Sequence, residues 1–126
     1  MSIILEDALG KTIKVNAWNW GVLHFAVACA KPPVFEDEDF LGRLRYGGGV
    51  TLSKEQADSL FEYLTEVVLP RLKPGQRMLT DFSVTDEPDD GTMHRDDLEK
   101  NYSLHHEVLV SVLHFLHEAQ APIEVM

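Results

Sequence analysis

The segment SLHHEVLVSVLHFLHEA, residues 103–119, decides the fold that we predict for this chain. At about 100° per residue, its apolar side chains fall on one broad arc of a helix, and most of its polar side chains fall on the opposite side. An arc this wide is typical of a helix that several neighbouring elements bury at once, so we expect a central helix over 103–119. The arc consists of Leu104, Val108, Leu109, Val112, Leu113, Phe115 and Leu116.

Both ends of the chain predict β-strands. Residues 2–15 have the pattern of a β-hairpin, because a short apolar run reaches a turn at Gly10 and an alternating run follows. Residues 122–126, PIEVM, alternate as a short strand does. We expect this last strand to pair with the hairpin and to bring the two chain ends together.

A helix over 17–30 is expected after Asn16, a favourable N-cap residue. It carries two apolar stripes, one containing Trp18 and Cys29 and the other Trp20, so we expect burial on two sides. The two tryptophans cannot share a helical face. Either one is buried and the other is partly exposed, as in a protein-binding hot spot, or both rings lie in the core. Cys29 is expected to be a buried small hydrophobe, and as the single cysteine it can form no internal disulfide, which fits a reducing compartment.

Two further helices and an irregular region lie between these elements. Acidic residues complement the first turn of a helix over about 36–46, and Ser53 with Gln56 predicts a capping box for a helix that Pro70 ends or kinks. The glycine run between these two helices predicts a flexible connector. Within 73–100 the regular pattern is weakest, and we expect an extended segment that contains Met78, Phe82 and Val84. Together these elements predict one α+β domain, residues 1–126, with three to four helices and a small sheet from the chain ends.

Composition narrows the classes of function. The 126 residues include 11 Lys and Arg against 21 Asp and Glu, a formal net charge of −10. This charge disfavours binding to nucleic acids and anionic membranes. It either favours a basic partner or only keeps the protein soluble. The N-terminus lacks the basic start and long apolar run of a signal peptide, and no segment reaches the roughly 20 apolar residues of a membrane span. We therefore expect a cytoplasmic protein.

The histidines suggest a metal site, but their spacing does not support one. His114 and His117 share a helical face, whereas a zinc site needs three or four convergent ligands. No HExxH or CxxC motif is present, and the acidic turn that begins at Asp86 has Pro88 where a calcium loop needs a side-chain oxygen. We expect no metal and no cofactor, with a metal-dependent protein as an alternative that elemental analysis would test.

His105 differs, because its angle places it within the apolar arc. A buried imidazole needs a hydrogen-bond partner, and His24 or Asn19 on the first helix could supply one. The alternative is a small-ligand site or an enzyme active site near His24 and His105. No catalytic motif with a recognisable local signature is present, so no catalytic residue is assigned.

The order of features resembles that of small bacterial and phage proteins of unknown function. The matching stretches are VNAWNWGVLH (15–24), YGGG (46–49), LSKEQADSLFEYL (52–64) and HFLHEAQAPIEV (114–125). In size, acidity and lack of a catalytic motif, the chain also resembles immunity proteins that neutralise a cognate toxin. This resemblance implies a non-catalytic inhibitor of a protein partner and assigns no functional residue.

We therefore expect an acidic binding protein of the immunity or antitoxin type that inhibits a basic partner, and a phage or structural assembly component is a further alternative. The oligomeric state is left open. Acidic loops would steer the association, and buried aromatic residues would supply affinity. The predicted contact residues form two clusters: Glu36, Asp37, Glu38 and Asp39, and then Asp86, Glu87, Asp89 and Asp90.

Overall fold

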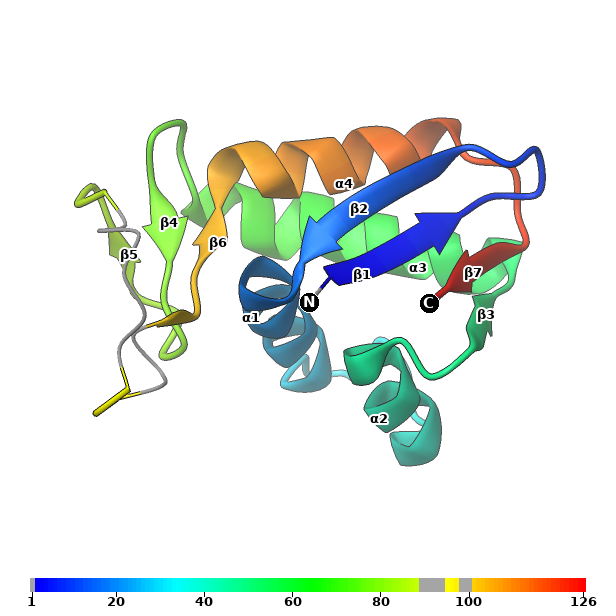
Figure 1. Ribbon diagram of the computed structural model, residues 1–126, viewed down its shortest axis with the longest axis horizontal. Coiled ribbons are helices and arrows are strands. Elements are labelled where there is room, and N and C mark those ends of the chain that lie inside the picture. Colours follow the sequence, from blue (N-terminus) through cyan, green and yellow to red (C-terminus); the bar gives the residue numbers. More distant parts are fainter. Residues whose placement is uncertain (1, 89–94, 98–100) are drawn as a thin grey trace.

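The residues that the structure describes form an α+β fold with four α-helices and two small antiparallel sheets, which confirms the predicted fold class (Figure 1). The computed structural model describes residues 2–88, 95–97 and 101–126. No helix among these residues is long and apolar enough to cross a bilayer. The helices are α1 (Ala17–Ala28), α2 (Glu38–Tyr46), α3 (Lys54–Tyr63) and α4 (His106–Glu118), and a π-helical turn (Leu64–Val68) and a 3₁₀ turn (Leu69–Arg71) continue α3.

The first sheet joins the two chain ends, as the sequence predicts. Its strand order is β2-β1-β7-β3, and Leu5 in β1 lies opposite Val125 in β7. The buried carboxylate of Asp7 joins the hairpin turn to the segment that precedes β7. It accepts hydrogen bonds from the backbone N–H groups of Leu9, Lys11 and Gln120 at 2.8–3.0 Å. The strands are β1 (Ser2–Glu6), β2 (Thr12–Asn16), β3 (Val50–Leu52) and β7 (Ile123–Val125).

The sequence reasoning missed strand β3 and misjudged the glycine run before it. Gly47 ends α2 in the left-handed conformation, with φ of 65°, and its backbone N–H donates to the carbonyl oxygen of Arg43. A Cβ at this position would overlap the backbone carbonyl carbon of Met126. Gly47 therefore packs tightly between α2 and the C-terminus, whereas a Cβ on Gly49 would meet nothing within 4 Å.

The central helix begins three residues later than predicted. Ser103–His105 is extended, and Leu104–His105 forms β6, which pairs with β4 (Arg77–Met78). The backbone N–H of His105 also donates to Asn19 Oδ1 at 2.8 Å. These tertiary hydrogen bonds outweigh the helical pattern of the segment, and α4 starts at His106. The second sheet has the order β5-β4-β6, with β5 at Val84–Thr85.

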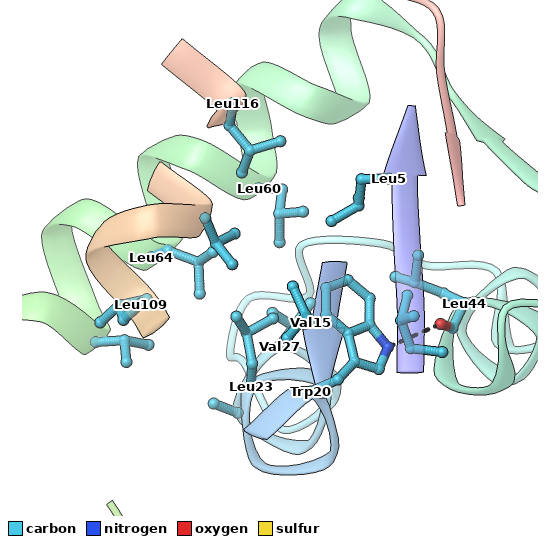
Figure 2. Packing of buried hydrophobic residues seen from close by; sticks show 14 of the residues in the cluster. Leu5, Val15, Trp20, Leu23, Val27, Leu44, Leu60, Leu64, Leu109 and Leu116 are labelled. Atoms are coloured by element: carbon cyan, nitrogen blue, oxygen red, sulfur yellow. Dashed lines mark hydrogen bonds between the residues drawn. The ribbon is translucent and has the colours of Figure 1, made fainter. Parts of the chain in front are cut away.

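One hydrophobic core lies between the first sheet and helices α1, α3 and α4 (Figure 2). Trp20 is 1% exposed, and its indole Nε1–H donates to the carbonyl oxygen of Leu44 at 3.1 Å, which ties α1 to α2. Most of the predicted arc of α4 is buried, including Leu109 and Val112. The N-cap at Asn16 and the capping box of α3 are also present as predicted.

Only one of the two stripes of α1 is fully buried, so the prediction of burial on two sides is wrong. Trp20, Leu23 and Val27 form the inner stripe. On the outer stripe, Phe25 is 48% exposed, Trp18 is partly exposed and Cys29 is exposed. Cys29 is therefore not the buried hydrophobe that we expected. The outer stripe leaves apolar surface without a covering element among the described residues.

Candidate functional site

The outer face of α1 forms one wall of a hollow of about 470 Å³. A second wall comes from Arg45 near the end of α2, and the others come from the turn after β4 and from the segment before β6. Four parts of the chain that are distant in sequence therefore meet around one space. The lining residues are Gly21, Val22, His24, Phe25, Arg45, Thr80, Asp81 and Tyr102.

Arg45 lies among aromatic rings in this hollow. Its guanidinium carbon is 5.4 Å from the ring centre of Tyr46 and 5.5 Å from that of Tyr102. Trp18 meets Tyr102 edge to face, with ring centres 4.8 Å apart. Cation–π contacts with two rings favour the charged guanidinium where it is partly removed from water.

Gly21 makes this arrangement possible. A Cβ on Gly21 would lie 2.8 Å from Cδ1 and Cε1 of Tyr102 and 2.9 Å from Nη1 of Arg45. The absence of a side chain therefore lets both groups rest directly on the α1 backbone. A glycine in a helix interior is unfavourable by about 1 kcal/mol relative to alanine, so its presence here fits a packing requirement.

His24 lines the same hollow and has a defined tautomer. Its Nε2 lies 2.6 Å from the carbonyl oxygen of Leu41. A carbonyl oxygen can only accept, so Nε2 carries the proton, and Nδ1 of the neutral ring is an acceptor. Burial lowers the pKa of His24 below its usual 6.5; the hydrogen bond to Leu41 opposes this shift and the charge of Arg45 adds to it. The ring is therefore neutral at pH 7.

The turn after β4 forms the opposite wall and holds a strained residue. Phe82 has φ of 68°, a left-handed conformation that is unfavourable for a bulky residue, and the extended conformation predicted for it is wrong. Its ring stacks on Phe25 with centres 5.3 Å apart, and its carbonyl oxygen accepts from Arg71. The Asp81 carboxylate accepts from the hydroxyl and the backbone N–H of Ser83, and these bonds lower its pKa. Asp81 is therefore a fixed negative charge at the rim.

The structure does not bring the two predicted acidic clusters together. Residues 36–39 are exposed at the start of α2, where Asp37 also caps the helix by accepting from the N–H groups of Asp39 and Phe40. Asp86 and Glu87 are exposed beyond β5, and Asp89 and Asp90 lie outside the described residues. Figure 1 shows α2 below the first sheet and β5 at the opposite end of the molecule.

His24 and His105 also lie apart, since they line different hollows. His105 lines a hollow of about 530 Å³ together with His106, Arg77 and Glu87. Of the two predicted partners of His105, Asn19 binds its backbone N–H, and His24 binds Leu41 instead. The single site near both imidazoles that the alternative hypothesis required is not formed by these hollows.

His114 and His117, which the sequence predicts on one face of the central helix, are both exposed on α4. They border an apolar groove of about 370 Å³ between α3 and α4, where His117 stacks on Phe61. In the part of the chain that the structure describes, no group of three or more His, Cys, Asp or Glu side chains is placed to hold a metal ion.

Arg45 and Tyr102 are the site residues that the sequence reasoning missed. The sequence pattern gave no role in a site to Arg45, in the helix predicted over about 36–46, or to Tyr102, just before the segment predicted as the central helix. The outer stripe of α1 carried a usable signal, because it contains the aromatic residues Trp18 and Phe25. No protein-family model matches the chain, and comparison with curated proteins and with solved structures finds no match either.

Proposed function

We propose that this chain is a non-catalytic binding domain that inhibits or holds a basic protein partner, in the manner of an immunity or antitoxin protein in the cytoplasm. The hollow on the outer face of α1 is the centre of its binding surface. One observation carries the proposal: the Arg45 guanidinium lies over the rings of Tyr46 and Tyr102 beside an open, apolar hollow.

The residue types around the hollow are those that dominate protein-binding energetics. Trp, Tyr and Arg are enriched among the few interface residues that contribute most of the affinity, and the aromatic ones bury large areas while losing little conformational entropy. Trp18, Arg45 and Tyr102 form one connected group here. Tyr46, at 70% exposed, and Phe25, at 48% exposed, extend the surface beyond the hollow.

The net charge supports a basic partner. A formal charge of −10 attracts a cationic protein over distances beyond direct contact, mostly by raising the association rate. The acidic clusters at 36–39 and 86–87 are exposed and contribute to this field from two sides of the molecule. The acidic clusters would therefore act mainly on the association rate, and the aromatic surface would act mainly on the affinity.

A small-ligand site in the same hollow is the second candidate. It is favoured by the volume of about 470 Å³, which lies within the range of ligand pockets, and by the acceptor at His24 Nδ1. Binding of a second copy of the chain, as in a structural assembly, is a third outcome that a mass measurement in solution would reveal.

The test is capture of partners by the immobilised chain from a lysate of the source organism. Phe25→Ala and Tyr102→Ala are expected to lose a captured basic protein, and Leu9→Ala is the control, because Leu9 is 70% exposed in the hairpin turn away from the hollow. Capture that survives both hollow variants, or capture of acidic proteins only, would overturn the proposal. Folding of each variant is checked by its near-UV circular dichroism.

A further inference from the structure

Arg45 has no negatively charged partner among the described residues. The ion pairs in this part of the chain join Arg43 to Asp39 at 3.8 Å and Lys54 to Asp58 at 2.9 Å, and both are exposed i,i+4 pairs on helices. Arg45 is partly buried, and its guanidinium makes cation–π contacts with Tyr46 and Tyr102. Because Arg45 forms no ion pair with Asp81 of the same hollow or with another described acid, its guanidinium N–H groups can donate to a ligand.

The chemistry of the hollow limits which anion fits. Guanidinium binds carboxylates and phosphates through paired N–H donors. The fixed carboxylate of Asp81 lines the same hollow and the whole chain is strongly acidic, so a dianion such as a phosphate group is disfavoured relative to a single carboxylate. Phe25, which is 48% exposed, supplies apolar surface for the group that carries this carboxylate.

We propose that the hollow receives the C-terminal carboxylate of the partner polypeptide, with an apolar or aromatic last residue. This inference rests on the proposed protein-binding function. Whatever its side-chain composition, a partner polypeptide that is not amidated carries one α-carboxylate at its chain terminus. The aromatic surface continues past the hollow at Tyr46 and Trp18, which suits a ligand attached to a larger body.

Each group of the terminus has a counterpart in the hollow. Arg45 donates to the carboxylate oxygens, and His24 Nδ1 is available to accept the N–H of the last residue, because Nε2–H already donates to Leu41. The last side chain packs against Phe25, whose position is fixed by stacking on Phe82. The partner needs no conformational change to offer these groups, since chain termini are generally exposed.

The experiment titrates N-acetyl-phenylalanine, its neutral amide and phenyl phosphate into the ¹⁵N-labelled chain. We expect the free carboxylate to shift the signals of the hollow residues with a dissociation constant in the millimolar range, as is typical of a ligand of this size. The amide and the phosphate are expected to bind at least about tenfold more weakly, because the amide loses a charge-assisted hydrogen bond and the phosphate dianion is repelled more strongly by Asp81 than a carboxylate is. Equal binding of acid and amide, or tighter binding of the phosphate, would overturn the inference.

Substitution of arginine provides the matched control. Arg45→Gln is expected to weaken binding of N-acetyl-phenylalanine about tenfold or more, whereas Arg43→Gln, on the same helix and outside the hollow, is expected to leave it unchanged. Arg45→Lys keeps the charge and is expected to restore part of the affinity. An equal loss of affinity in both Gln variants would mean that only the net charge of the protein matters, and this would contradict a binding site at Arg45.

Two peptides distinguish the source of the carboxylate and separate this inference from the proposed function. A hexapeptide ending in free Phe is expected to bind, and the same peptide with an amidated end and an internal Glu is expected not to bind. If both peptides fail while the full chain still captures a basic partner through Phe25 and Tyr102, the terminus is wrong and the protein-binding function stands. If the amidated peptide binds equally well, a side-chain carboxylate is the ligand and the inference fails.

Discussion

Gly21 shows how a single missing side chain organises the candidate site. Alanine in a helix interior is ordinarily more stable than glycine by about 1 kcal/mol. Here a Cβ would lie 2.8 Å from the ring of Tyr102, so we predict that Gly21→Ala destabilises the protein instead. In a Tyr102→Ala background the clash is removed, and the same substitution is expected to stabilise the protein.

Chemical unfolding of the four variants measures this coupling as a double-mutant cycle. We expect an interaction free energy of about 1–3 kcal/mol between positions 21 and 102, within the range for residues in contact. Arg45 Nη1 is also close to position 21, but it is the end of a flexible side chain and can move. A coupling near zero would show that Tyr102 does not rest on the α1 backbone.

His24 gives the site a predictable dependence on pH. Burial lowers the pKa of the folded imidazole below 6.5, so the unfolded chain takes up a proton at a pH where the folded chain does not. The contribution of His24 to stability therefore falls as the pH drops through 6.5 towards the lowered value, and it is fully present above 6.5. We predict that His24→Gln, which can still donate to Leu41, reduces the loss of stability between about pH 7.5 and pH 5.5.

Urea midpoints at the two pH values provide the measurement, with His114→Gln as the control for an exposed histidine on α4. The control is expected to lose as much stability on acidification as the unsubstituted chain does. If the His24→Gln variant loses as much stability on acidification as the unsubstituted chain, burial does not protect the imidazole of His24 from protonation.

At the level of elements, the end of α2 is held by contact with the C-terminus. Gly47 and Gly49 both have positive φ, 65° and 73°, but only Gly47 lies against another part of the chain, the backbone of Met126. We predict that Gly49→Ala costs about 1 kcal/mol, the penalty for alanine in the left-handed region, and that Gly47→Ala costs more because the C-terminal residue must move. Thermal unfolding of the two variants tests the difference, and equal losses would show that the contact with Met126 does not constrain the fold.

The elements that could be predicted from the sequence are those whose signals are local. Asn16 and Ser53 cap their helices through side-chain bonds to N–H groups two or three residues away, and these pairs are visible in the sequence. The error at Ser103–His105 has the opposite cause. Pairing with β4 and the bond from His105 N–H to Asn19, 86 residues away, hold this segment extended, and periodicity carries no information about such partners.

The candidate site was less predictable than the fold for the same reason. Arg45 and Tyr102 meet only because α1 and α2 are joined through Trp20 and Leu44 and because β6 carries Tyr102 past Gly21. The aromatic stripe of α1 was visible in the sequence, but a periodic stripe of Trp18 and Phe25 looks the same whether a core or a partner covers it. Burial distinguishes the two cases, and Phe25 is 48% exposed.

For the whole molecule, the positions of the acidic clusters determine how they can act. The cluster at 36–39 lies at the start of α2 and the pair at 86–87 follows β5, so the two lie at separate places on the fold (Figure 1). They can still act together through the electrostatic field, which extends about 10 Å at 0.1 M salt. Their contributions to association should therefore be additive and should depend on ionic strength.

Charge reversal of each cluster tests this role of the field. Glu36→Lys with Glu38→Lys, and separately Asp86→Lys with Glu87→Lys, each change the formal net charge from −10 to −6, and Asp37 is left in place because it caps α2. Each pair is expected to slow association with the captured basic partner about tenfold at low salt and to have little effect near 1 M salt. Dissociation rates are expected to stay nearly constant, whereas Tyr102→Ala is expected to raise the dissociation rate. Stopped-flow measurements separate the association rate from the dissociation rate. A charge reversal that changes only the dissociation rate would place that cluster in direct contact with the partner. A charge reversal that changes neither rate would show that the cluster does not steer association.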